Sequence, residues 1–387
     1  MFDKYRIRAT GTSMVELATQ QSKVRDLTES RRRIPIEVDG AGSYEVLLAM
    51  WTAFSPEEGQ TAFDLGPEWI TSVREATPED VAAEILALGG PGCAAWLSLL
   101  GLIATAPHPH DPDRVFDWLG QLNPQRLRRW ILGYLGHFAD PALVEEAAEG
   151  DIDAVRQIVG EHKEPEVVEQ IVALFEIPPE EIRDRMAGTI KRFRSEVFKK
   201  YEDDFYPAID RAAAAQRATS SREDAKKVIE DVTNGVDYGI PLGVTRVILI
   251  PSVVLKPFSV IDQHRESLLV LYGITDEFID SDPEAPPSWL VKTYKALSDE
   301  RRLRILRRLS ESETTLDELT DLLGLSKSTV HHHISVLRGA GLIRVHISRN
   351  KDTKEASTYA LRTQALTNAG EFLDTYVRTD HPAASNE

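Results

Sequence analysis

The sequence predicts a mainly α-helical protein with a small β component, arranged as an α-rich N-terminal domain followed by a winged helix-turn-helix. Apolar residues recur at helical spacing through most of the first 280 residues. A polar, proline-rich run, DSDPEAPP, interrupts this pattern at residues 280–287, as is typical of a linker. Two helical segments separated by a short turn then follow, and two short alternating segments come after them.

We therefore expect four parts: an α-rich domain over residues 1–280, a linker over 281–287, a winged helix-turn-helix over 288–378 and a tail over 379–387. A length of 387 residues suits two or three domains, and a hydrophobic fraction of 42% supplies a sizeable core. The first part would be a regulatory domain that binds a ligand or dimerises.

Charge is divided unevenly along the chain. Residues 285–378 carry 15 Lys and Arg against 11 Asp and Glu, so the net charge of −17 combines +4 in this stretch with −21 elsewhere. Binding to phosphate requires positive charge. Only the C-terminal part therefore has the sign expected for a nucleic-acid partner.

The sequence contains one cysteine, Cys93, so an intramolecular disulfide cannot form and a reducing compartment is favoured. The first residues lack the apolar stretch of a signal peptide, and no run approaches the roughly 18 apolar residues of a membrane span. We expect a cytoplasmic protein without a membrane partner, with Cys93 as a small buried residue at the start of a helix.

Helical periodicity before the linker predicts several helices, some of which open with proline, whose missing N–H costs nothing in the first turn. The expected helices span residues 44–52, 78–88, 92–103, 112–119, 124–137 and 141–148. Residues 179–218 predict one long amphipathic helix or two. Between residues 240 and 270, β-branched residues and prolines replace the helical spacing, which predicts two or three strands.

After the linker, capping residues mark where each helix begins. Ser298 or Asp299 can cap the helix that carries the apolar run of residues 303–309. Thr315 can cap the next helix, with Glu318 three residues later completing a capping box. These signals predict two consecutive helices before the turn.

The turn between the second and third helices is Gly324-Leu325-Ser326. Gly324 suits a left-handed helix end, and Ser326 can cap the third helix. Rotation of about 100° per residue places one apolar set on a single face of that helix. Its members are Val330, Ile334 and Leu337.

The opposite face of the third helix is polar. Ser328, His332 and Ser335 lie on it. His331 flanks this face, and Lys327 and Thr329 stand in the first turn. Such a face, presented by the second helix of a helix-turn-helix, can contact base edges in the major groove of double-stranded DNA.

Two short strands are expected after this helix, at residues 342–347 and 357–361, where apolar and polar residues alternate. The loop between them reads SRNKDTK. Its cations, Arg349, Lys351 and Lys354, are placed to meet phosphate or to enter the minor groove.

The runs ALSDERRLRILRRLSE and LDELTDLLGLSKSTVHHHISVLRGAGLI together resemble the arsenic-repressor (ArsR) family of winged-helix regulators, over about ninety of the 387 residues. The resemblance implies a transcription regulator, a repressor controlled through its N-terminal domain. It also implies that Lys327, Ser328, His331 and His332 contact DNA. Family members dimerise through the helices that flank the motif, which match residues 289–297 and 366–377, so a homodimer is expected.

The chain departs from the usual family run at a few positions. Glu300 and Arg301 stand where the family has Pro-Thr, Thr320 replaces Ala, and His331 replaces Ser. None of these disturbs the apolar pattern. His331, however, falls among the base-contacting positions and could change the preferred operator.

We expect no cofactor and no metal site. The consecutive histidines 331–333 diverge by about 100° per residue and cannot converge on one ion. The family's cysteine ligands are replaced by residues 316–319, which read Leu-Asp-Glu-Leu, while Asp374 and His381 do not share one helical face. The His-x-His of residues 108–110 is interpreted as a loop held rigid by proline.

Three interpretations of the whole chain remain open at this stage. The N-terminal domain could be an enzyme or effector-binding domain of unknown chemistry, although no nucleophile elbow, paired-ligand spacing or phosphate loop is present. The winged helix could instead bind protein. We expect a regulator that is not an enzyme, with a small-molecule effector as one alternative, for which four tryptophans could line a pocket. They are Trp51, Trp96, Trp118 and Trp130.

Overall fold

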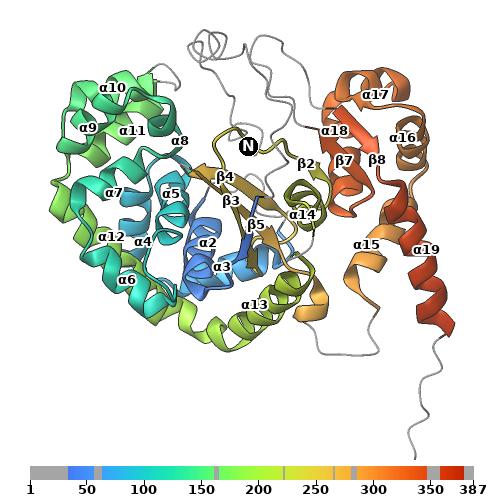
Figure 1. Cartoon of the computed structure of the whole chain (residues 1–387), viewed down its shortest axis with the longest axis horizontal. Helices are drawn as coiled ribbons and strands as arrows, with labels where there is room; N and C mark the ends of the chain where they lie inside the picture. The colour runs from blue at the N-terminus through green and yellow to red at the C-terminus, as the bar shows by residue number, and fades with distance from the viewer. Residues whose placement is uncertain are drawn as a thin grey trace, which may run out of the picture. The chain divides into compact units, whose positions relative to one another are not determined.

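The computed structural model describes residues 34–55, 63–160, 165–220, 223–264, 266–279, 286–346 and 358–378. The chain divides into two compact units (Figure 1). Unit 1 comprises residues 1–225 and 241–274, and unit 2 comprises residues 226–240 and 275–387. The units therefore do not follow the expected boundary, because residues 226–240 leave the N-terminal part and join the C-terminal one.

Unit 1 contains a four-stranded sheet in the order β1-β3-β5-β4. The strands are β1 (Ile36–Val38), β3 (Arg246–Ser252), β4 (Ser259–His264) and β5 (Ser267–Gly273). The first three in spatial order are parallel, and β4 runs antiparallel to β5. β3 and β5 are almost fully buried, as is expected for parallel strands covered on both faces.

Helices make up most of unit 1. They are α2 (Gly42–Phe54), α3 (Gly66–Ala76), α4 (Glu79–Gly89), α5 (Ala94–Ile103), α6 (Pro112–Gly120), α7 (Pro124–Ile131), α8 (Gly133–Phe138), α9 (Pro141–Glu149), α10 (Ile152–Gly160), α11 (Pro165–Glu176), α12 (Pro179–Phe193) and α13 (Lys199–Ser220). A short 3-10 turn, η2 (Pro91–Cys93), precedes α5, and a π-helical turn, η3 (Arg194–Phe198), joins α12 to α13. The mainly helical fold class with a small β component is confirmed.

The helices α6, α7 and α9 open with proline, as expected from the sequence. Asp111, Asn123 and Asp140 cap helices that open with proline. Cys93 is buried at the start of α5, with its Sγ 3.4 Å from the carbonyl oxygen of Phe54. The expectation of one helix over residues 124–137 is wrong, because Gly133 has a φ of +56° and separates α7 from α8.

A buried carboxylate joins α2 to the turn that follows β3. Glu45 is 1% exposed, and its Oε1 accepts hydrogen bonds from the backbone N–H groups of Val253 and Val254, both at 2.8 Å. Burial raises the pKa of Glu45 to about 7, against the opposing effect of hydrogen bonds from Ser252, Val253 and Val254. The core of unit 1 therefore contains a titratable group that satisfies two backbone donors.

In its described residues, unit 2 contains a small sheet, the C-terminal helices and one segment from earlier in the chain. The helices are α15 (Ser288–Leu297), α16 (Glu300–Glu311), α17 (Leu316–Leu323), α18 (Lys327–Gly339) and α19 (Thr363–Arg378). The strands, in spatial order, are β2 (Val236–Asp237), β7 (Ile343–His346), β8 (Thr358–Leu361) and β6 (Thr314–Thr315). α14 (Ala225–Val232) leads into β2, a strand that sequence analysis did not predict.

In the described part of the chain, no single helix is long and apolar enough to cross a membrane. One pair, residues 79–89 and 91–103, meets the length and composition test only when its two helices, bent by 86°, are taken together.

Candidate nucleic-acid interface

The helix-turn-helix of unit 2 is positioned by the capping residues that the sequence indicates. The Asp299 carboxylate accepts bonds from the backbone N–H groups of Arg301 and Arg302 at the start of α16. Thr315 and Glu318 form the capping box of α17. Gly324 ends α17 with a φ of +62°. These predictions are confirmed.

α18 is held against the rest of unit 2 by its apolar face. Val330, Ile334 and Leu337 are at most 3% exposed. They pack in one core with residues from α16, α17, β7 and β8. Packing within unit 2 therefore sets the orientation of α18 and determines which of its faces points away from the core.

His333 lies on the buried side of α18 and not on its polar face. It is 5% exposed, and burial lowers its pKa below the ordinary value. His332 is exposed and His331 is half-buried, so the three neighbouring histidines point in different directions. Among the described residues, no group of three or more His, Cys, Asp or Glu side chains could hold a metal ion.

The polar face of α18 is open to solvent. Lys327, Ser328, His332 and Ser335 are exposed, and Thr329 and His331 are half-buried. The structure thus brings these six residues together on the N-terminal two thirds of one helix. They can donate and accept hydrogen bonds, which is what contact with base edges requires.

Several of these side chains have partners within the protein. The Ser326 hydroxyl caps α18 and lies 3.0 Å from the Ser328 hydroxyl and 2.8 Å from that of Thr329. Lys327 Nζ lies 2.7 Å from Asp317 Oδ1, and this hydrogen bond raises the pKa of Lys327. The ammonium group therefore remains charged. To bind a phosphate it must give up its contact with the Asp317 carboxylate.

The two strands expected after α18 are present as β7 and β8, which pair antiparallel with Val345 opposite Tyr359. Residues 347–357, which include Arg349, Lys351 and Lys354, lie outside the described residues. Their assignment to phosphate contacts stays a prediction.

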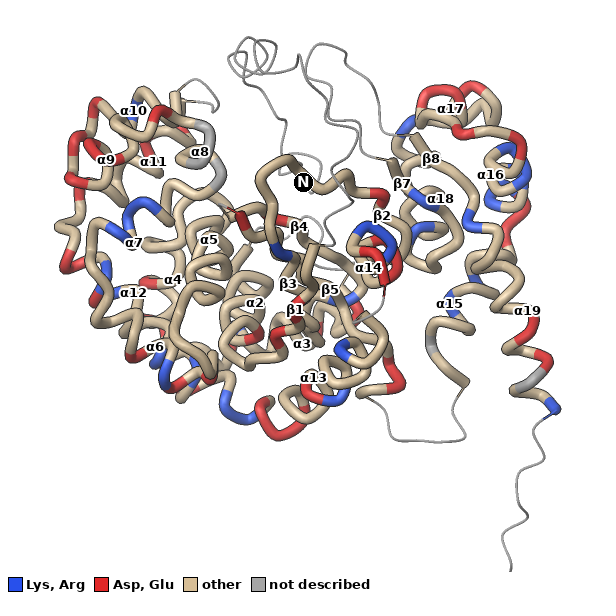
Figure 2. Tube along the Cα trace, in the orientation of Figure 1, with Lys and Arg blue, Asp and Glu red and all other residues tan. Residues whose placement is uncertain are grey.

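Helix α16 presents a positive stripe that sequence analysis did not single out. Arg301, Arg304 and Arg307 are exposed. Figure 2 shows basic residues in blue along α16. Because they are three residues apart, consecutive arginines of this set are neighbours on the surface of the helix. This i, i+3 spacing of arginines was the signal that could have identified them as further candidates for phosphate contact.

The helices that flank the motif lie together and leave apolar side chains in solvent. Trp289 of α15 packs edge-on against Phe372 of α19, with ring centroids 5.1 Å apart, and the Tyr294 hydroxyl donates to the carbonyl oxygen of Ala369. Tyr294 and Phe372 are each 38% exposed, and Val377 is 72% exposed. This pair of helices forms a second candidate surface, suited to a protein partner.

A helix-turn-helix with a capped second helix, an exposed polar face and a following two-stranded wing defines the class of winged-helix DNA-binding domains. Within that class, residues 299–345 match the family model described as bacterial regulatory protein, arsR family. The C-terminal part of the chain is therefore an ArsR-family helix-turn-helix domain, as the sequence motifs predicted.

A curated relative supports the same family. Over 68 residues the chain is 39% identical to the transcriptional activator HlyU of Vibrio cholerae serotype O1 (strain ATCC 39315 / El Tor Inaba N16961). The match covers 18% of this chain and 56% of the relative, so the chain spans about half the length of that protein.

Proposed function

We propose that this protein is a sequence-specific DNA-binding transcription regulator whose α18 enters the major groove. The exposed polar face of α18, presented by a capped helix within an ArsR-family domain, carries the proposal. Selection of bound fragments from a pool of random duplexes tests it. We expect one motif to be enriched, whereas a bound pool identical to the input would overturn the proposal.

In this proposal the residues of α18 and those of the wing have different roles in DNA binding. Six residues of α18 contact base edges and nearby phosphates. They are Lys327, Ser328, Thr329, His331, His332 and Ser335. The wing cations Arg349, Lys351 and Lys354 supply affinity through phosphate and carry no sequence information themselves.

Changing Arg349 and Lys351 to Ala should therefore weaken binding to every duplex by a similar factor. Each lost phosphate contact should make the plot of log affinity against log salt shallower by about 0.9. Fluorescence anisotropy with a selected and a random duplex over a series of salt concentrations measures both quantities. Lys200→Ala, which removes an exposed charge from α13, is the control, and a loss confined to the selected duplex would contradict the assignment.

We also propose a homodimer formed through α15 and α19, which reads a near-palindromic site with half-sites about one helical turn apart. Exposed Phe372 and Val377 support this surface. Sedimentation at micromolar concentration should give a dimer of the 43.2 kDa chain. Phe372→Asp with Val377→Asp should give a monomer, and the control Leu242→Asp, at a fully exposed leucine of unit 1, should not. A parent chain that stays monomeric on its selected duplex would remove the symmetric model.

Repression is the proposed direction of control, because a dimer seated on its operator can exclude other proteins without further contacts. The relative HlyU is a transcriptional activator, and that description applies to HlyU alone. Regulation of transcription would place the protein in the cytoplasm with the chromosome. A reporter gene downstream of the selected motif should be expressed more strongly when the gene for this protein is deleted.

Unit 1 is the proposed regulatory part, with a small-molecule effector as its ligand. A cavity of about 420 Å³ lies where β1 ends and α2 begins. Parallel sheets commonly bind ligands beyond the carboxyl ends of their strands. Asp39, His108, His110, Tyr206 and Arg217 are among the lining residues. None of the four candidate tryptophans lines this cavity.

A non-enzymatic role for unit 1 is part of the proposal. His110 and Asp39 form the acid–base pair nearest to a catalytic dyad in this cavity, with His110 Nδ1 and Asp39 Oδ2 2.5 Å apart. Burial lowers the pKa of His110, but the bond to Asp39 outweighs it and raises the pKa overall. His110 Nε2 is 2.9 Å from the carbonyl oxygen of Ala106. Both ring nitrogens are thus engaged, which supports a structural role.

A further inference from the structure

Unit 2 includes a segment of the chain that is flanked on both sides by unit 1. Residues 226–240, called the strap below, contain most of α14 and all of β2. Ala225 before the strap and Pro241 after it both belong to unit 1. The strap therefore leaves unit 1, joins the winged-helix domain and returns.

The strap adds an edge strand, β2, to the sheet of the wing. β2 pairs parallel with β7, with Val236 opposite Val345 and Asp237 opposite His346. The Val345 N–H donates to the carbonyl oxygen of Gly235 at 2.8 Å. The outer edge of β7, which would otherwise present unpaired backbone groups, is covered over this length.

Close approach of the strap to the wing depends on Gly235. Its φ is +99°, and a Cβ at this position would lie 2.7 Å from the carbonyl oxygen of Ile343 and 2.8 Å from Arg362 Cδ. Any side chain at residue 235 must therefore push the strap away from the wing.

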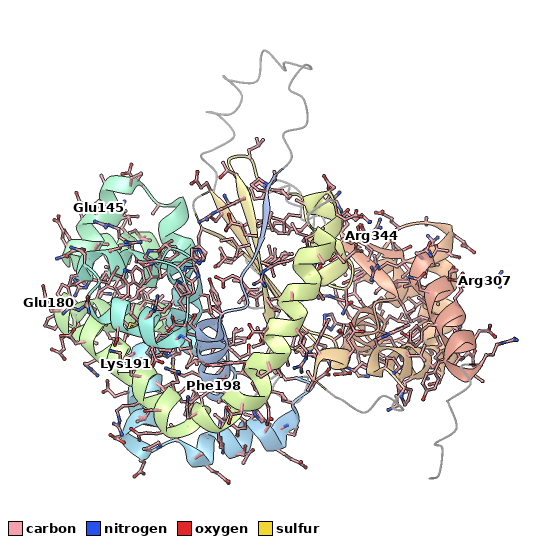
Figure 3. The ribbon with its side chains drawn as sticks, turned by 60° about the horizontal axis from the view of Figure 1, so that its bottom comes forward. Glu145, Glu180, Lys191, Phe198, Arg307 and Arg344 are labelled. Carbon is pink, nitrogen blue, oxygen red and sulfur yellow. The ribbon has the colours of Figure 1, made fainter. Side chains whose placement is uncertain are left out.

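Acidic residues of the strap pair with basic residues of the wing domain. Glu230 Oε1 lies 2.7 Å from Arg344 Nε and 2.6 Å from Arg344 Nη2. Arg344 is labelled in Figure 3. Asp237 Oδ2 lies 3.0 Å from His346 Nδ1, and Asp231 Oδ1 lies 3.7 Å from Arg362 Nη2.

The two closest pairs are held firmly. The side chains of Glu230 and Asp237 are only 17% and 15% exposed. Although burial acts in the opposite direction, Lys226 and His346 together lower the pKa of Asp237. Both carboxylates are therefore shielded from bulk solvent, and Asp237 remains charged well below neutral pH.

The paired wing residues occupy one face of β7. Arg344 and His346 are two positions apart, so they share the outer face of the strand, while Ile343 and Val345 are buried. Side chains on this face stand immediately before the wing loop that is expected to meet phosphate. A carboxylate already bound to such a cation competes with any phosphate for it.

We propose that the strap is an autoinhibitory element: it occupies the basic outer face of the wing and lowers the affinity of the domain for DNA phosphate. Because unit 1 holds both ends of the strap, a change in unit 1 can strengthen or release it. The inference rests on the proposed DNA-binding function and adds to it the element through which unit 1 controls the wing.

Removing the carboxylates of Glu230 and Asp237 tests the proposal. We expect Glu230→Gln with Asp237→Asn to bind a random duplex at least about fivefold more tightly at low salt, with a salt plot steeper by about one unit, because the guanidinium group of Arg344 becomes free for phosphate. The charge-matched control is Asp203→Asn with Asp204→Asn, two exposed residues of α13. An equal gain in the control, or weaker binding in the strap variant, would overturn autoinhibition.

A second variant displaces the strap without changing charge. Gly235→Ala should also tighten binding and should accelerate amide exchange at Val345, whose N–H loses its partner. Gly243→Ala is the control, because Gly243 also has a positive φ, +89°, but its Cβ would meet nothing within 4 Å. Faster exchange at Val345 without tighter binding would show that the strap pairs with the wing and does not inhibit it.

These outcomes separate the two proposals. If the parent, the controls and both strap variants all fail to bind any duplex at low salt, the DNA-binding function is wrong. If the parent binds and the strap variants gain nothing, only the autoinhibitory role is wrong.

Discussion

Replacing Ser328 and His332 together by Ala should lower affinity for the selected duplex by at least about 30-fold, because each base contact contributes roughly 1 to 3 kcal/mol of discrimination. Both side chains are exposed on the polar face of α18, one turn apart. Affinity for a random duplex should change far less, since that binding depends on phosphate contacts. Anisotropy titrations with the two duplexes under identical salt and pH measure the ratio.

The substitution leaves the fold of unit 2 intact on physical grounds. The described bonds of Ser328 reach only the Ser326 hydroxyl, and the cap of α18 keeps its bond between Ser326 and the Thr329 N–H. Ser310→Ala with Thr219→Ala, two exposed positions on α16 and α13, is a matched control. A similar loss on both duplexes would mean that these α18 residues contribute general affinity and do not read bases.

The parts of the site that sequence analysis located are those specified by local interactions. Thr315, Gly324 and Ser326 each act on backbone groups within three or four residues, so their roles can be assigned from spacing alone. The buried and exposed faces of α18 follow from helical rotation. Both predictions hold because no distant segment is needed to satisfy them.

The parts that were missed depend on pairing between distant segments. β1 is three residues long and pairs with β3 about two hundred residues later, and β2 is two residues long and pairs with β7. Strands this short carry too little periodicity to be recognised. Their pairing is decided by tertiary packing, and for β2 by the room that Gly235 leaves beside Ile343.

For a related reason, the division into two units differs from the boundary expected at residues 280–287. The proline-rich run of residues 280–287 marks where the winged helix begins, but composition cannot show that residues 226–240 return to it. Glu230 and Asp237 look like ordinary solvated charges in sequence, and only the pairing of β2 with β7 brings them to Arg344 and His346. Buried Glu45 was hidden in the same way, because the backbone N–H groups that donate to it belong to Val253 and Val254, about two hundred residues further on.

Replacing Glu45 by Ala should destabilise unit 1 by about 2 to 5 kcal/mol, because the N–H groups of Val253 and Val254 would stay buried without an acceptor. Urea unfolding followed by tryptophan fluorescence reports mainly on unit 1, since Trp289 is the one tryptophan of unit 2. Glu45→Gln is the matched variant. Its amide oxygen can accept both bonds, so we expect it to fold with nearly the stability of the parent.

The same pair of variants should reveal the titration of Glu45. Burial raises its folded-state pKa to about 7, above the ordinary value of 4.5, so the folded state binds the proton more tightly. This contribution to stability is complete below pH 4.5 and is lost as pH rises through 7. Between pH 6 and 8.5 the parent should lose about 1.4 kcal/mol relative to Glu45→Gln, which cannot titrate. Taking the difference between the two proteins cancels the other titrating groups, and a difference that stays constant over this range would show that Glu45 does not titrate between pH 6 and 8.5.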